Sequence, residues 1–161
     1  MGASMTMDLE GDKALQRKLE QIEPKLQRKV IRQAVRATGK VVLPEAQANA
    51  ISMVGGDMGK LLKRHLGLRT YKKHRRGTYA MRIAISPEAN DQLVHVSRWT
   101  GRSYIPAAIE YGHEAPDGSH VPAIPFMRKA YVSHGRRAVD EGVKTLHAGV
   151  EREAAAGVKQ R

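Results

Sequence analysis

Cysteine does not occur in this chain of 161 residues. Its absence excludes disulfide scaffolds, zinc sites built from thiolates and cysteine nucleophiles, and it is consistent with a reducing compartment. Aromatic residues are also scarce, at 4%, so aliphatic side chains and alanine must fill most of the core. No apolar run approaches the roughly 18 to 20 residues of a membrane span, and the N-terminus lacks the apolar segment of a signal peptide. We therefore expect a soluble intracellular domain without a membrane partner.

Acidic residues are few relative to basic ones. Lys and Arg number 28 against 16 Asp and Glu, which gives a formal net charge of +12 and a pI of about 10.2. Hydrophobic residues make up 41% of the chain, which is too many for a fully disordered polyelectrolyte. The length suits one domain, which we place at 8–153 between a flexible N-terminus at 1–7 and a flexible tail at 154–161. Its partners should be anionic or oligomeric.

Helical patterns dominate the first third of the chain. Apolar residues at helical spacing predict a short helix near 8–22 and a longer one that starts at Pro24. Pro44 should kink or break the second helix, and the glycine-containing stretch 53–59 should be a flexible connection. The outer face of the second helix is strongly basic. Its residues are Lys25, Arg28, Lys29, Arg32, Arg36 and Lys40.

The stretch 60–82 is the most basic of the chain, with nine Lys or Arg residues and no Asp or Glu. Part of it predicts a strand pair, 68–73 and 78–86 around a turn at 74–77, and 93–96 is a further short strand. Two interpretations remain open: a nucleic-acid surface, with Tyr71 and Tyr79 available for stacking, or a solvated face. The candidate contacts to DNA or an acidic partner are Lys60, Lys63, Arg64, Arg69, Lys72, Lys73, Arg75 and Arg76.

The last third predicts mostly loop and one long helix. Between 99 and 120 we expect a loop with one short helix, which starts at Pro106 and stops at Gly112. Pro122 and Pro125 should frame an extended link before Phe126 opens the final helix. In that helix Gly135, Gly142 and Gly149 recur every seven residues, which favours close approach of another helix, for instance from a neighbouring subunit. The fold class is α+β: a small antiparallel sheet packed against a long N-terminal helical region and a C-terminal helix.

Little in the sequence indicates catalysis. His113, Glu114, Asp117 and His120 could in principle surround a metal ion, but their spacing matches no metal motif and Pro116 begins a turn signal. A solvated loop is the better interpretation. The sequence has neither a G-x-S-x-G nucleophile motif nor a phosphate-binding P-loop. We therefore predict no enzyme activity, no catalytic residues, no cofactor and no metal.

Two compact motifs carry a resemblance. Residues 104–112 form a Tyr-x4-Ile-Glu-Tyr-Gly block, and 121–130 read VPAIPFMRKA at the entrance to the last helix. This arrangement resembles the neck or tail-completion proteins of long-tailed bacteriophages, which are often described as minor tail components, and the resemblance spans roughly 8–153. Met58 departs from the Thr or Ser that the family commonly has before the glycine.

The resemblance implies assembly rather than catalysis. Such proteins form a ring through which DNA passes, between the capsid connector or head-closure proteins and the tail terminator or tail-tube proteins. A hexamer is favoured and a dodecamer is the alternative; the ring would assemble in the host cytoplasm and reside in the virion neck. The alternative function is a basic nucleic-acid-binding accessory protein.

Eight residues of the two motifs are candidates for the subunit or partner interface. They are Tyr104, Glu110, Tyr111, Gly112, Pro122, Pro125, Phe126 and Arg128. For Glu110 two alternatives stand side by side, a helix-terminal charge that faces water and a partner for an arginine of a neighbouring subunit.

Overall fold

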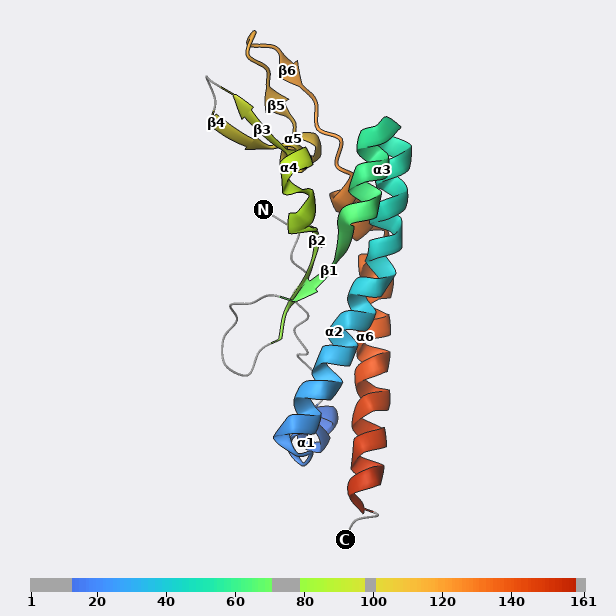
Figure 1. Cartoon of the computed structure of the whole chain (residues 1–161). Coiled ribbons are helices and arrows are strands. Elements are labelled where there is room, and N and C mark those ends of the chain that lie inside the picture. Colours follow the sequence, from blue (N-terminus) through green and yellow to red (C-terminus); the bar gives the residue numbers. More distant parts are fainter. Residues whose placement is uncertain (1–12, 71–78, 98–100, 159–161) are drawn as a thin grey trace. The chain divides into compact units, whose positions relative to one another are not determined.

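The computed structural model describes residues 13–70, 79–97 and 101–158, and its elements are labelled in Figure 1. The helical elements are α1 (Lys13–Glu20), α2 (Pro24–Asn49), the π-helix η1 (Ala50–Val54), α3 (Gly56–His65), the 3₁₀ turn η2 (Pro87–Ala89), α4 (Asn90–Leu93), α5 (Ile105–Tyr111) and α6 (Phe126–Val158). The strands are β1 (Leu66–Thr70), β2 (Met81–Ile85), β3 (Val94–Ser97), β4 (Gly101–Tyr104), β5 (His113–Glu114) and β6 (His120–Val121). The class is α+β, as predicted.

Contacts within the chain gather into two compact units. The first comprises the described residues of 42–67 and 83–135, and the second those of 4–41, 68–82 and 136–161. The chain passes from one unit to the other within α2, β1, β2 and α6. Four elements continue from one unit into the other, so the division into units does not by itself define two domains. The single domain expected over 8–153 stays a prediction.

The second unit is built on helices packed through small and aliphatic side chains. The buried cluster draws on α1, the turn that follows it, the N-terminal half of α2 and the C-terminal half of α6. Its members are Leu15, Ile22, Val30, Ala34, Leu146 and Val150. Figure 1 shows these halves of α2 and α6 side by side. Gly149 allows the approach, because a Cβ there would lie 2.7 Å from Cγ1 of Val30. The close helix contact expected from the glycine spacing therefore exists at Gly149, and its partner is α2 of the same chain.

The start of the first unit is more continuously helical than the sequence predicts. Helix α2 begins at Pro24 as predicted and continues through Pro44, so the predicted break is absent and the predicted kink stays a prediction. Proline inside a helix costs about 3 kcal/mol, and the buried neighbours Val42 and Ala46 supply packing that offsets this cost. The stretch 53–59 is likewise not a flexible connection: it completes η1, turns at Gly55 with φ 71°, and begins α3.

Gly59 shows why this glycine-containing turn is ordered. It is buried in α3, and a Cβ there would lie 2.5 Å from the carbonyl oxygen of Ala50. Its own N–H donates to the Gly55 carbonyl at 2.7 Å. The π-helix and α3 therefore meet backbone to backbone, which only glycine permits at this position.

The strands form three separate pairs rather than one sheet: β1 with β2, β3 with β4 and β5 with β6. Burial alternates over the first three residues of β2, where Met81 and Ile83 are buried and Arg82 is exposed. The pairs β3–β4 and β5–β6 are antiparallel, and β4, β5 and β6 were not anticipated in a segment expected to be mostly loop. The turn predicted at 74–77 lies outside the described residues.

The two C-terminal helices lie close to their predicted bounds. Helix α5 begins at Ile105, one residue before the predicted Pro106, and ends just before Gly112, whose φ is 75°. Helix α6 begins at Phe126 as predicted. Helix α6 continues to Val158, beyond residue 153, where we expected a flexible tail to follow. Among the described residues, no helix is both long and apolar enough to cross a membrane.

Candidate functional site

The N-terminus of α6 is capped by a carboxylate from another helix. Met127 N–H donates to Oε2 of Glu110 at 2.9 Å, and Arg128 N–H donates to Oε1 at 2.8 Å. Glu110 lies near the end of α5 and is only 6% exposed. A carboxylate at this position also opposes the positive end of the helix macrodipole. Glu110 thus performs the task that a Ser or Asp N-cap usually performs.

The need for this cap follows from the local sequence. The residue before α6 is Pro125, which has no side-chain acceptor for the N–H groups of the first turn. The Phe126 N–H donates to the Ile124 carbonyl at 2.8 Å, and the Lys129 N–H donates to the Pro125 carbonyl at 3.0 Å. Together with the two bonds to Glu110, all four leading N–H groups of α6 have acceptors.

The first sequence-based alternative for Glu110, a charge that faces water, is wrong because the side chain is buried. Both carboxylate oxygens accept hydrogen bonds from N–H groups of the same chain, and pairing with an arginine of a neighbouring subunit stays a prediction. The sequence places Glu110 in an otherwise apolar IEYG block, which marks it as unusual. Its acceptor role depends on contact with Met127 and Arg128, which follow it by 17 and 18 residues.

Further contacts join the two motifs that carry the resemblance. The Ile124 N–H donates to the Ile109 carbonyl at 2.7 Å, and the amide of the buried Asn49 donates to the Phe126 carbonyl at 3.2 Å. At Gly112 a Cβ would lie 2.7 Å from the Val121 carbonyl oxygen. Residues 104–112 and 121–130 thus form one interlocked structure, which we call the motif block.

The motif block divides the eight predicted interface residues into internal and surface groups. Phe126 is fully buried, and Gly112 and Pro125 are half-buried, so these residues and Glu110 build the block itself. The surface group consists of Tyr104, Tyr111, Pro122 and Arg128. Tyr104 is 39% exposed and Tyr111 is 56% exposed. Partial burial raises the pKa of the Tyr104 hydroxyl.

The β5–β6 hairpin holds the histidines and carboxylates that we considered as metal ligands. Its strands pair Glu114 with His120, and these side chains are exposed. Within the part of the chain that the structure describes, no group of three His, Asp or Glu residues could hold a metal ion. Asp117 instead accepts hydrogen bonds from the Ser119 hydroxyl at 2.6 Å and the Ser119 N–H at 2.9 Å, which lower the pKa of its carboxyl.

The predicted basic residues of 60–76 fall into three groups. Lys60, Lys63 and Arg64 are exposed on α3, where Lys60 contacts Asp57 at 3.2 Å. Arg69 is half-buried in β1, and its Nε has no hydrogen-bond acceptor. The other four lie outside the described residues: Lys72, Lys73, Arg75 and Arg76.

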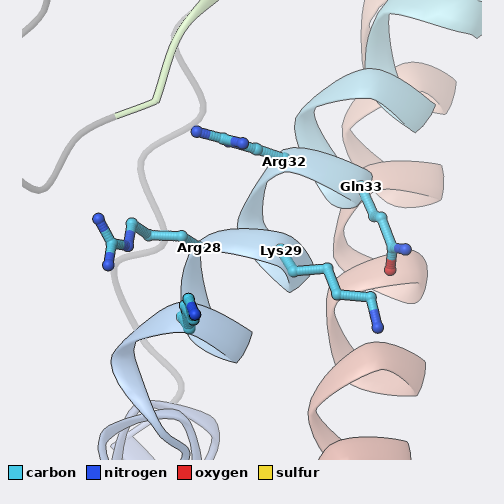
Figure 2. A pocket seen from close by; sticks show the side chains of 5 residues that line it. Arg28, Lys29, Arg32 and Gln33 are labelled. Carbon is cyan, nitrogen blue, oxygen red and sulfur yellow. The ribbon is translucent and has the colours of Figure 1, made fainter.

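A second basic surface lies on α2 and was not among the predicted contacts. Four cations and one amide line a shallow hollow in the second unit: Lys25, Arg28, Lys29, Arg32 and Gln33 (Figure 2). The guanidinium of Arg32 lies 5.3 Å from the ring centroid of Tyr79, a cation–π distance. The helical spacing of these residues was visible in the sequence, but it indicated only a basic outer face.

Comparisons of the chain with protein-family models, with curated proteins and with solved structures found no match.

Proposed function

We propose that this chain is a subunit of a ring at the head–tail junction of a long-tailed bacteriophage, through which DNA passes. Six copies are favoured, with the capsid connector or head-closure proteins on one side and the tail terminator or tail-tube proteins on the other. The ring would assemble in the host cytoplasm and reside in the virion neck. The observation that most supports the proposal is the motif block, because both motifs of the resemblance fold together and present tyrosines at their surface.

The surface of the motif block has the chemistry of a subunit contact. Tyr104 immediately precedes the seven-residue helix α5, and Tyr111 is its last residue. Aromatic side chains are enriched in protein interfaces. Because Glu110 and Phe126 anchor the block, these tyrosines stand on a supported backbone. Binding would therefore lose less conformational entropy than contact through a free loop.

The neighbouring strand pairs also favour assembly. The β3–β4 and β5–β6 pairs have two strands each within the described residues. Two-stranded hairpins are marginally stable alone, and an open strand edge can pair with another chain. Val96 in β3 is 69% exposed, so an apolar side chain stands on one of these pairs. A neighbouring subunit or tail protein could cover both the edges and this side chain.

Mass measurement by light scattering tests the proposal. The purified chain is measured at low and high salt, alone and then with purified tail tubes. We expect a discrete hexamer, or a monomer that becomes bound to tails. A chain that stays monomeric and does not bind tail tubes at any salt concentration would overturn the ring proposal.

Paired tyrosine variants locate the contact. Tyr104→Ala with Tyr111→Ala should reduce assembly or tail binding at least about tenfold, since aromatic anchors contribute about 2 kcal/mol or more at interfaces. The matched control is Tyr131→Ala, which removes a tyrosine that is 43% exposed on α6 outside the motif block. Equal loss in both variants would contradict the assigned contact.

A basic nucleic-acid-binding accessory protein is the second candidate function. The exposed cations of α3 and of the α2 hollow favour it. This function predicts a monomer that binds duplex DNA with steep salt dependence and has no affinity for tail tubes. The same light-scattering series, with duplex DNA in place of tails, separates the two functions.

A further inference from the structure

The hollow on α2 concentrates positive charge within two turns of one helix. Residues three and four apart lie on the same helix face. Lys25, Arg28 and Arg32 have this spacing along α2, and Lys29 is four residues after Lys25. In Figure 2, Arg28 and Arg32 extend to one side of the helix, while Lys29 and Gln33 extend toward α6. All of these residues belong to the second unit.

The charge in the hollow is largely uncompensated. Lys29 contacts Glu153 at 3.3 Å, and the same carboxylate also contacts Arg152 at 3.4 Å. Among the described residues, no carboxylate lies within ion-pair distance of Lys25, Arg28 or Arg32. Like charges four residues apart repel each other along a helix. An anion in the hollow would relieve this repulsion.

Both arginines are held in place by contacts that keep their charge available. Arg28 Nε donates to the Pro24 carbonyl at 3.1 Å, and the Arg32 guanidinium contacts the Tyr79 ring. The Tyr79 hydroxyl in turn lies 3.3 Å from the Thr70 hydroxyl. A positioned guanidinium offers a planar set of N–H donors that suits phosphate oxygens.

We propose that this hollow binds the phosphate backbone of duplex DNA. Lys25 and Arg32 are separated by about 10 Å along the helix axis, and one DNA strand presents about three phosphates over that length. Gln33 lies on the side of α2 that faces α6, where its amide oxygen accepts a hydrogen bond from Arg152 at 3.2 Å, so the proposed contact rests on Lys25, Arg28 and Arg32. The inference deepens the proposed function, on which it rests for the identity of the anion, and it assigns the DNA contact to α2 rather than to 60–76.

Two matched triple variants test the assignment in the full-length chain. The first replaces Lys25, Arg28 and Arg32 with Gln, and the control replaces Lys60, Lys63 and Arg64 with Gln. Each removes three exposed cations. Lys29 is kept because of its contact with Glu153. Binding to a fluorescent duplex of random sequence is measured by anisotropy over a series of salt concentrations, and thermal melting monitored by circular dichroism verifies that each variant is folded.

We expect the α2 variant to bind at least about tenfold more weakly near 0.1 M salt, with a salt slope reduced by about 2 to 3, because each phosphate contact contributes about 0.9 to that slope. The α3 control should lose less than about threefold. Equal losses would show that only net charge matters, and an unchanged α2 variant would place the contact elsewhere; either result overturns the proposal. If the α2 triple variant melts early, Lys25→Gln and Arg28→Gln singly should each lower the slope by about 1.

Two further arms separate this inference from its alternatives. Arg28→Lys with Arg32→Lys keeps the charge and should retain most of the binding. Vesicles with anionic lipid, at matched phosphate concentration, should bind the α2 variant and the natural chain alike. Selective loss of vesicle binding with unchanged DNA binding would overturn the proposal.

Ring assembly is measured separately by light scattering. A ring that binds DNA independently of α2 would therefore refute only this inference, and DNA binding through α2 without assembly would refute only the ring.

Discussion

The two ends of α6 are stabilised by different chemistry. At its N-terminus, in the first unit, a buried carboxylate accepts hydrogen bonds from the first turn. In its C-terminal half, in the second unit, Gly149 lets the helix backbone approach Val30 of α2. The first contact depends on the charge and reach of one side chain, and the second depends on the absence of a side chain. The comparison shows that one continuous helix can be specified by polar complementarity at one end and by steric fit at the other.

Removing the Glu110 carboxylate should produce the largest change. Glu110→Ala leaves the N–H groups of Met127 and Arg128 without their acceptor, and we expect the free energy of unfolding to fall by about 3 kcal/mol. Glu110→Gln keeps one acceptor oxygen and should lose about half as much. Urea denaturation of both variants provides the measurement. Equal stability of Glu110→Ala and the natural chain would contradict the capping role.

The close contact between Gly149 and Val30 predicts that Gly149→Ala destabilises the natural chain but stabilises a chain that lacks the Val30 side chain. Gly149→Ala gains about 1 kcal/mol of helix propensity, but the clash with the stiff Val30 side chain costs about 1 to 3 kcal/mol, so we expect net destabilisation. In a Val30→Ala background the same substitution should become stabilising. Gly135→Ala is the control, because its Cβ would meet only the Tyr131 ring at 3.8 Å, and it should stabilise. Thermal melting is measured for the natural chain, the three single variants and the double variant. Destabilisation by Gly149→Ala in both backgrounds would argue against the close approach.

A smaller effect is expected from the ion pair beside the same helix contact. The Lys29 side chain is 54% exposed and that of Glu153 is 10% exposed, so solvent screens the pair. A double-mutant cycle with Lys29→Gln and Glu153→Gln should give a coupling energy of about 0.5 kcal/mol at low salt. The coupling should shrink in 1 M salt, where the Debye length is about 3 Å. A coupling that is independent of salt would refute an electrostatic origin.

The Asp117 turn should provide the smallest effect. Hydrogen bonds from Ser119 lower the pKa of the Asp117 carboxyl in the folded chain. Its contribution to stability is therefore present above the pKa of an unfolded aspartate and is lost as the pH falls through the lower folded value. Ser119→Ala should move the pKa of Asp117 back up toward its ordinary value, as followed by an NMR titration. An unchanged titration would show that Ser119 does not cause the shift.

Local sequence signals predicted several element boundaries correctly. Pro24 and Phe126 begin helices, and Gly112 ends one. The same reasoning wrongly allowed a break at Pro44 and wrongly predicted a flexible connection at 53–59, because packing overrides helix propensity there. The strands β4, β5 and β6 escaped prediction because their segment is rich in glycine, proline and tyrosine, and pairs of two to four residues leave little periodicity to detect.

The candidate sites were predictable to different degrees. Both motifs were recognised as special, yet the sequence could not separate the internal Glu110 and Phe126 from the exposed Tyr104 and Tyr111. Burial of Glu110 depends on contact with residues 17 and 18 positions away, and no local pattern encodes that contact. The basic spacing of α2 was visible, but a helical stripe of cations looks the same whether or not it surrounds a hollow.

By itself the sequence determined the absence of thiol chemistry, the excess of positive charge, the mixed α+β class and the positions where proline and glycine begin or end helices. These properties belong to single residues and their immediate neighbours. Only the tertiary structure decided that Glu110 caps α6 and that Gly149 accommodates Val30. Each of these depends on two distant segments meeting within a few ångströms, and the free energy of such a contact is settled by packing and desolvation in the folded chain.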